Sequence, residues 1–272
     1  MPELPEVETV VRGLRRMLIG VRLGAVEYAS ARISRANRRG WKSNLSGREI
    51  TSIDRRGKYM ILHLSGGHAL VAHLRMTGRL WIKDEPYRRD IHDRLVIGLS
   101  TKKCLVLNDT RQFARVEWRA PGTLDTHPGL AKLGPEAPGL TAVEFHRICQ
   151  QSRRPIKSLL LDQTRLAGLG NIYADESLFK AAIRPSTPAV SLGLRRTARL
   201  HDAIQRILGR AIEACGTTVD TFSDVEGSAG GFAPFLMVYG RTGQPCRVCD
   251  AAIRRIQIAG RSAHYCSRCQ RR

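Results

Sequence analysis

The sequence is short of acidic residues and has no long apolar run. It holds 24 Asp and Glu against 45 Lys and Arg, a formal net charge of +21. No stretch resembles a transmembrane helix, and the N-terminus lacks the apolar core of a signal peptide. We therefore expect a cytoplasmic protein, nucleoid-associated if the source is bacterial. The charge indicates a polyanionic partner, either nucleic acid or an anionic membrane surface.

The cysteines do not form the paired set of a small secreted protein. Three of the seven are isolated, and we predict them to be buried as small apolar residues: Cys104, Cys149 and Cys215. The other four form two Cys-x-x-Cys pairs, separated by residues 250–265 that read as a hairpin turning at Gly260. This spacing indicates one tetrahedral zinc ion bound by Cys246, Cys249, Cys266 and Cys269. Residues 238–272 contain eight arginines and one acid, so this module is expected to contact a nucleic-acid backbone.

The first residues predict a helix that starts almost at the N-terminus. Pro5 and Glu6 suit a first helical turn, and apolar residues then recur at helical spacing up to Leu18. Pro2 is small enough for the initiator methionine to be removed. A free prolyl amine titrates near ~8, and it is a nucleophile that forms an iminium with an aldehyde-like carbon. Glu3 and Glu6 are then placed to move protons. The alternative is an ordinary capped helix with a frayed tail.

Short strands follow the helix, and helices follow the strands. Eight strands with turn residues between them favour a sandwich or flattened barrel, over residues 21–28, 49–54, 59–64, 69–74, 79–82, 94–99, 104–108 and 114–118. The basic segment 32–39 with Lys42 is predicted to be a solvated loop. After a linker at 119–130, helices are expected over 141–148, 156–161, 172–182 and 192–214. Residues 216–239, rich in Gly, Ser and Thr, are expected to form a loop that closes over a ligand or serves only as a linker.

Several residues in these segments suit nucleic-acid chemistry. Lys58 follows two arginines, which favours proton transfer or phosphate binding. Met76 and Phe113 end strands on a basic surface, either as wedges for a base stack or as core residues. His92 is either a candidate of the same kind or a histidine bound by Asp93. The Gly turn before Asn171, which is expected to cap the next helix, presents backbone N–H groups to phosphate. Lys157 either points to the same place or is a solvated lysine.

Five motifs in this order resemble the formamidopyrimidine-DNA glycosylase family. They are the start Met1-Pro2-Glu3-Leu4-Pro5-Glu6, the strand Arg56-Gly57-Lys58-Tyr59, the turn Gly168-Leu169-Gly170-Asn171-Ile172-Tyr173, the segment Val238-Tyr239-Gly240-Arg241 and the four-cysteine hairpin. The resemblance implies an α+β fold. An N-terminal helix and β-sandwich (1–125) precede a helix-two-turn-helix bundle (126–237) with a lesion-capping loop at about 217–231. A zinc finger completes the chain (238–272).

The resemblance also implies the role of each site residue. Pro2 matches the nucleophile, Glu3 the general acid/base, Glu6 a supporting carboxylate, Lys58 the β-elimination lysine and Arg261 the δ-elimination arginine. Met76, Arg111 and Phe113 match the residues that fill the space left by a flipped base, with Arg111 facing the orphaned cytosine. His92, Lys157 and Asn171 match phosphate contacts, and Arg153 is transferred from a weaker match. Gln112 and Ala114 depart from the residues usual in the family, where arginine or lysine and glycine stand.

The implied function is base excision repair. The chain is expected to be a monomeric DNA glycosylase and AP lyase with one structural Zn²⁺, acting on duplex DNA that contains oxidised purines or abasic sites. Two alternatives remain. An endonuclease VIII-like enzyme for oxidised pyrimidines usually has Gly where Leu4 stands and lacks the long capping loop. A non-catalytic zinc-finger protein would bind DNA without forming a covalent adduct.

Overall fold

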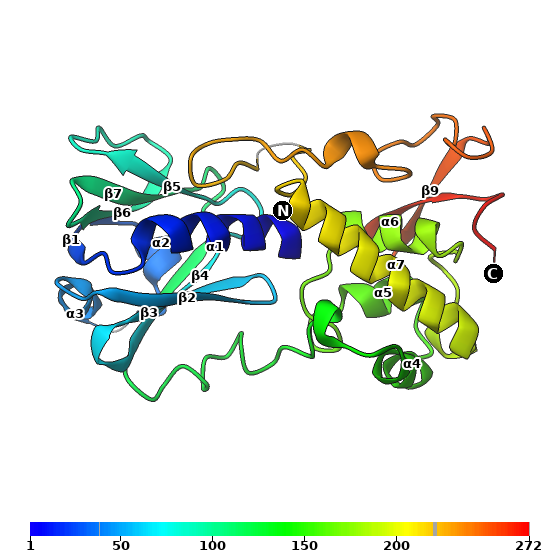
Figure 1. Cartoon of the computed structure of the whole chain (residues 1–272), viewed down its shortest axis with the longest axis horizontal. Coiled ribbons are helices and arrows are strands. Elements are labelled where there is room, and N and C mark those ends of the chain that lie inside the picture. Colours follow the sequence, from blue (N-terminus) through cyan, green and yellow to red (C-terminus); the bar gives the residue numbers. More distant parts are fainter. Residues whose placement is uncertain (38, 220–221, 272) are drawn as a thin grey trace. The chain divides into compact units, whose positions relative to one another are not determined.

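The computed structural model describes residues 1–37, 39–219 and 222–271, which form two compact units (Figure 1). The first unit combines Met1–Ala131 with Ala214–Gly231, and the second combines Lys132–Glu213 with Phe232–Arg272. Residues 214–231, which span the predicted capping loop, thus group with the N-terminal residues. Positions 220 and 221 of that loop lie outside the described residues. The three-part division at 125 and 237 stays a prediction.

The first unit starts with the predicted helix, α1 (Leu4–Leu18). Pro5 stands in its first turn, where a missing N–H costs no hydrogen bond. Its apolar residues recur on one side and are at most 1% exposed: Val7, Val10, Val11, Leu14 and Leu18. Gly20, with φ of +82°, follows the helix in the left-handed conformation that glycine tolerates best. The amphipathic pattern therefore buries α1 and fixes the position of its first residues.

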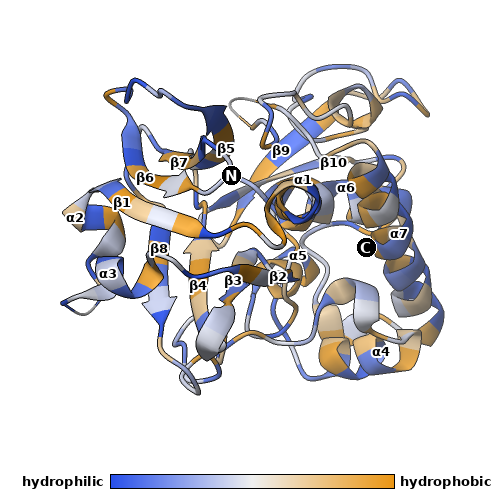
Figure 2. Ribbon diagram, turned by 60° about the vertical axis from the view of Figure 1, so that its left-hand side comes forward, coloured by the Kyte–Doolittle hydropathy of each residue, from blue (hydrophilic) through white to orange (hydrophobic). Residues whose placement is uncertain are grey.

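Eight strands form two antiparallel sheets of four, as a sandwich requires. One sheet has the order β1-β6-β7-β5 and the other β2-β3-β4-β8, and residues of both sheets share one apolar core with α1. Figure 2 shows how hydrophobic β4 is, and five of its six residues are buried. All eight predicted strands are confirmed: β1 (Leu23–Ala29), β2 (Ile50–Arg56), β3 (Tyr59–Leu64), β4 (His68–His73), β5 (Arg79–Asp84), β6 (Asp93–Leu99), β7 (Lys103–Asn108) and β8 (Arg115–Arg119).

The predicted solvated loop after β1 is wrong. Two short helices occupy this region, α2 (Ala31–Ser34) and α3 (Trp41–Leu45). Ile33 and Leu45 are fully buried and Trp41 is 7% exposed, so burial of these apolar side chains outweighs the solvation of the surrounding basic residues. Position 38 lies outside the described residues.

The second unit contains four α-helices in its described residues and a terminal hairpin. The helices are α4 (Ala142–Gln150), α5 (Ile156–Leu161), α6 (Asn171–Lys180) and α7 (Leu194–Glu213), and the hairpin pairs β9 (Ile253–Ile258) with β10 (Arg261–Cys266). Short 3₁₀ turns occupy Ser65–Gly67, Ala137–Gly139, Ala189–Ser191 and Ala233–Phe235. Thr141 and Glu144 form a capping box that starts α4. The predicted α+β fold is confirmed. None of the described helices is long and apolar enough to span a bilayer.

Candidate active site

The start of α1 places Pro2 beside two buried carboxylates. Glu3 and Glu6 are each 2% exposed, and Pro2 is buried. The backbone N–H of Glu3 donates to Glu6 Oε2 (2.8 Å), and the N–H of Thr217 donates to Glu6 Oε1 (2.7 Å). Glu6 is therefore held from both sides, by the helix start and by the returning segment 214–231. This arrangement places the two carboxylates one and four residues after Pro2 in the chain.

Gly216 allows this close approach to Glu6. An added Cβ at Gly216 would lie 2.9 Å from Glu6 Oε1 and 3.0 Å from its Cγ. Its φ of +85° is also in the left-handed region, so a side chain there would be both strained and obstructed. The sequence gives no direct sign of this contact, because the two residues are far apart in the chain.

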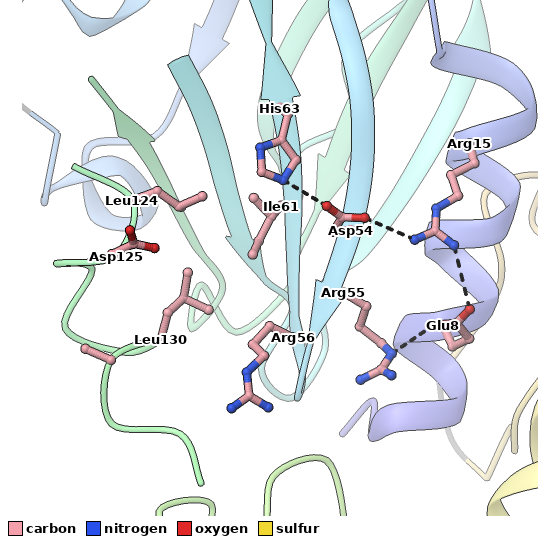
Figure 3. Close-up of a pocket in the computed structure, with 11 residues that line it drawn as sticks. Glu8, Arg15, Asp54, Arg55, Arg56, Ile61, His63, Leu124, Asp125 and Leu130 are labelled. Atoms are coloured by element: carbon pink, nitrogen blue, oxygen red, sulfur yellow. Dashed lines mark hydrogen bonds and ion pairs between the residues drawn. The ribbon is translucent and has the colours of Figure 1, made fainter. Parts of the chain in front are cut away.

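The third acid of the N-terminal segment, Glu8, is bound to arginines. It lines a pocket of about 700 Å³, where it accepts from Arg55 Nε (2.9 Å) and lies 4.0 Å from Arg15 (Figure 3). Burial alone raises the pKa of Glu8, but its hydrogen bonds and ion pairs with Arg55 and Arg12 hold it below the ordinary value. In the same pocket Asp54 pairs with Arg15 and His63. Glu8 is thus a charged residue with a structural role in this pocket.

Lys58 lies in the tight turn between β2 and β3. Arg56 pairs with Tyr59 across the hairpin, and Gly57 has φ of +58°. The Lys58 side chain is only 5% exposed. Burial, together with the positive charges of Arg75 and Lys58, lowers the pKa of nearby His73 to about 3. His73 is therefore neutral near pH 7, and its Nδ1 accepts the N–H of Arg75 (3.0 Å) in the turn that carries Met76.

One carboxylate holds the two turns that carry the predicted void-filling residues. Asp109, fully buried, accepts from Thr77 Oγ1 (2.5 Å) and from the backbone N–H groups of Arg111 (3.2 Å) and Ala114 (2.8 Å). Met76 directly precedes Thr77 in the chain, and Phe113 lies between Arg111 and Ala114. The hydrogen bonds of these three neighbours to Asp109 therefore hold both turns. Sequence reasoning gave Asp109 no role. Its position directly after a buried strand and before the turn is the only signal that points to it.

Met76, Phe113 and Arg111 all reach solvent. Met76 and Phe113 are partly exposed, so the alternative that they belong to the core is wrong. Arg111 is exposed, and its guanidinium carbon lies 4.8 Å from the centre of the Phe113 ring. Such a cation–π pair orients both side chains together.

His92 is half-buried and is not bound by its neighbour Asp93. The Asp93 carboxylate instead accepts from Tyr87, from the N–H of Asp90 and from Asn108. The His92 ring has Arg94 at 3.5 Å, and its backbone carbonyl accepts the N–H of Asp109. The predicted phosphate contact of His92 stays a prediction.

In the second unit, Lys157 is fully buried. Its ammonium donates to Asp175 Oδ1 (2.6 Å) and to the carbonyl of Ser262 in the finger hairpin. The other oxygen of Asp175 accepts from the N–H (2.9 Å) and Nδ1 (3.0 Å) of His264. The alternative of a solvated lysine is wrong. The sequence showed this lysine but not its partner, since an acid on the next helix gives no local signal. The role of Lys157 as a phosphate contact stays a prediction.

The remaining predicted DNA contacts of the second unit lie at its surface or near it. Asn171 is the first residue of α6 and Gly170 is the N-cap, so the predicted capping by Asn171 is wrong. The Asn171 Oδ1 is buried, and within the described part of the chain no hydrogen-bond donor reaches it. Arg153 is exposed before α5, and Arg261 is exposed at the first position of β10. Their roles stay predictions.

The four paired cysteines gather at one point. Their sulfur atoms all lie within 4.8 Å of one another, with Cys246 and Cys266 fully buried. Four thiolates at this separation fit one tetrahedral zinc ion, as predicted. Of the isolated cysteines, Cys104 and Cys149 are buried as expected, whereas Cys215 is exposed.

An α+β fold with a buried N-terminal acid pair, a four-cysteine zinc finger and a strongly basic surface defines a zinc-binding enzyme that acts on nucleic acid. Comparison with known sequences makes this specific. Residues 1–116 match the formamidopyrimidine-DNA glycosylase N-terminal domain, and residues 133–223 match the H2TH domain of the same enzymes. Residues 243–272 match the zinc finger found in FPG and IleRS. The chain therefore belongs to the formamidopyrimidine-DNA glycosylase family.

Named relatives and solved structures cover nearly the whole chain. The formamidopyrimidine-DNA glycosylase of Moorella thermoacetica is 44% identical over 94% of this chain and 95% of its own. That of Lactiplantibacillus plantarum is 40% identical over 98% of both. The Lactococcus lactis Fpg, solved in complex with DNA containing an abasic site, superposes with a TM-score of 0.93 at 36% identity and covers 100% of both chains. MutM (FPG) from Thermus thermophilus gives 0.88 at 39% identity over 99% of this chain and 98% of its own.

Proposed function

We propose that this enzyme removes oxidised purines, namely 8-oxoguanine and formamidopyrimidines, from duplex DNA and then cuts the strand at the abasic site. The observation that carries the proposal is the buried Pro2-Glu3-Glu6 arrangement at the start of α1. Family membership supports it, as do the solved Lactococcus lactis complexes with DNA that contains an abasic site or Fapy-dG. A prolyl amine supplies the nucleophile for base excision, and the adjacent buried acids supply the proton transfers.

Catalysis starts with a free prolyl amine. Met1 is 42% exposed and precedes a small residue, which suits removal by an aminopeptidase. The Pro2 nitrogen donates its lone pair to C1′ of the damaged nucleotide, and the N-glycosidic bond breaks. The base leaves with the bonding electrons and takes up the N–H proton that the attacking Pro2 nitrogen loses. The C1′–O4′ bond then opens, Glu3 protonates O4′, and a C1′ iminium with Pro2 remains.

The iminium also leads to strand cleavage. Because its positive charge acidifies C2′–H, loss of that proton expels the 3′ phosphate by β-elimination. Loss of the C4′ proton then expels the 5′ phosphate by δ-elimination, and water hydrolyses the iminium to restore the amine. Lys58 acts in the first elimination and Arg261 in the second. The position of Lys58 supports its role, because its side chain is 5% exposed and is held in the tight turn between β2 and β3.

DNA binding uses the other predicted residues. Met76, Arg111 and Phe113 fill the space of the extruded nucleotide, with Arg111 facing the orphaned cytosine, and offset an extrusion cost of a few kcal/mol. His92, Arg153 and Asn171 act at the phosphates, and Thr217–Gly231 covers the lesion. Lys157 acts at the phosphates indirectly, because its ammonium holds the Ser262 carbonyl of the finger hairpin. Zinc, bound by the four paired cysteines, would hold the finger hairpin that carries Arg261. The charge of +21 and the bacterial relatives support action on nucleoid DNA in the cytoplasm.

Borohydride trapping tests the proposal. Borohydride reduces the iminium to a stable protein–DNA adduct on an 8-oxoguanine:C duplex, and intact-mass spectrometry identifies the N-terminal residue. We expect an adduct at Pro2 from wild type and a strongly reduced adduct yield from both Glu3→Gln and Pro2→Gly. An adduct formed at full yield on a protein that keeps Met1 would contradict the mechanism. Faster trapping on a thymine glycol duplex would favour the endonuclease VIII-like alternative, and DNA binding without an adduct would favour the non-catalytic one.

A further inference from the structure

A groove of about 600 Å³ in the second unit takes no part in the proposed chemistry. It lies among α6, α7, the turn Ala233–Phe235 and the start of the zinc finger. Of the predicted site residues, only the zinc ligand Cys269 lines it. The groove therefore stands apart from the residues proposed to act on DNA, and its chemistry points to a different occupant.

The floor of the groove is apolar and partly open to solvent. Phe235 is 50% exposed and Val248 is 66% exposed, while Phe232 and Phe179 lie buried beneath them at 1% and 9%. The Phe232 and Phe235 rings are in contact, with centres 5.8 Å apart. Burial of this surface is worth roughly 25 cal/mol per Å². An aromatic or branched aliphatic side chain is the group that would gain most here.

The rim of the groove is cationic. Lys180, Arg210 and Arg247 border it, and among the described residues no carboxylate lies within ion-pair distance of these three. Arg210 is held over the Phe235 ring at 5.1 Å, and Arg247 donates to the Pro234 carbonyl (2.7 Å). Two of the three charges are thus fixed in place before any ligand arrives, which lowers the entropy cost of binding.

The acid that lines the groove cannot balance this charge. Glu176 is 1% exposed, and its two oxygens accept the backbone N–H groups of Met237, Val238 and Tyr239. A fourth rim cation, Arg206, already pairs with Asp202. The groove therefore offers unbalanced positive charge around an apolar floor.

We infer that this groove binds a short acidic segment of a partner protein, with one or two large apolar side chains on the floor and carboxylates at the rim. Charge complementarity selects the acidic partner, and the exposed Phe235 and Val248 select the apolar anchor. Duplex DNA matches the rim but not the floor, because its exposed surface is phosphate and sugar and its bases are stacked. This inference holds whether or not the proposed catalytic mechanism does.

The test is a selection of random twelve-residue peptides on the full-length, zinc-loaded chain. Enriched peptides are then measured by fluorescence anisotropy against wild type, Arg210→Glu and Phe235→Ser. Arg199→Glu is the matched control, because Arg199 is exposed on the same helix but does not line the groove. We expect acidic peptides with an aromatic or leucine anchor. Affinity should fall at least about tenfold for Arg210→Glu and Phe235→Ser and change little for Arg199→Glu.

Several results would overturn the inference. If peptides without acidic residues bind equally well, the cationic rim does not select the ligand. If Arg210→Glu and Arg199→Glu lose peptide affinity equally, the peptide does not bind in this groove. Displacement of the peptide by undamaged duplex would make the groove a DNA surface. Self-association in sedimentation experiments that Phe235→Ser abolishes would make its occupant a second copy of the chain. A selection that enriches nothing would leave no peptide site.

Discussion

Replacement of Asp175 by asparagine should destabilise the second unit strongly. The carboxylate and the Lys157 ammonium it binds are both completely buried, 2.6 Å apart. Asparagine keeps the shape and can still accept from His264, but it removes the negative charge that the buried Lys157 ammonium binds. Breaking a buried ion pair on one side costs about 3–5 kcal/mol. With a urea m-value of about 2 kcal/mol/M, the unfolding midpoint of the second unit should fall by about 2 M.

The molecule supplies its own optical control for this measurement. All three tryptophans, Trp41, Trp81 and Trp118, lie in the first unit, whereas the helices α4 to α7 lie in the second. In urea titrations, Asp175→Asn should therefore shift the unfolding transition followed by circular dichroism at 222 nm much more than the transition followed by tryptophan fluorescence.

Two further variants make the result decisive. Asp202→Asn breaks the exposed pair with Arg206 and should cost at most about 0.5 kcal/mol. The double variant Lys157→Met/Asp175→Asn removes both charges of the buried pair and should recover most of the lost stability. A loss below about 1 kcal/mol for Asp175→Asn, or no recovery in the double variant, would refute the reasoning.

Three other predictions follow from the site. Gly216→Ala should slow borohydride trapping more than about tenfold, because its Cβ would meet Glu6. Gly227→Ala is the control: with φ of +97° and no atom within 4 Å of the added Cβ, it adds similar backbone strain and should trap at the wild-type rate. Equal trapping rates for the two variants would show that the contact of Gly216 with Glu6 does not affect catalysis. Folded His73 stays neutral down to about pH 3 but takes up a proton near 6.5 when unfolded, so its stabilising contribution is full above pH 6.5 and falls by about 1.4 kcal/mol per unit below it. His73→Gln should lose this part of the pH dependence, measured by tryptophan fluorescence in urea between pH 4 and 7, and an unchanged slope would contradict it. Wild type should release one zinc per chain to a chromophoric chelator, and Cys249→Ser should lose its zinc to EDTA under conditions where wild type keeps it; equal retention would exclude Cys249 as a ligand.

Local patterns predicted the elements of this fold well. The eight strands and the helices α1 and α4 to α7 were predictable because alternation and helical spacing can be read within single segments. The zinc ligands were predictable for the same reason, since their spacing is local. The region of α2 and α3 was not, because its charged residues mask three apolar side chains that are buried by distant partners.

The partners of the site residues were not predictable. The carboxylate of Asp109 holds two turns separated by more than 30 residues, and Asp175 binds residues of α5 and of the finger hairpin. Each of these contacts depends on which elements pack together, and a single sequence does not encode that in any short pattern. The residues proposed for chemistry stand in recognisable motifs, whereas the residues that hold them in place do not.

The return of residues 214–231 to the first unit has a consequence for engineering chimeras within the family. The backbone of Ile82 donates to Val225, and the side chain of Val225 fills the space beside Gly13, so this segment is tailored to α1 and β5. Exchanging everything after residue 131 with a homologue would import a foreign segment against native α1. A hybrid that keeps 214–231 from the parent of the N-terminal half should fold better, although it needs three splice junctions instead of one.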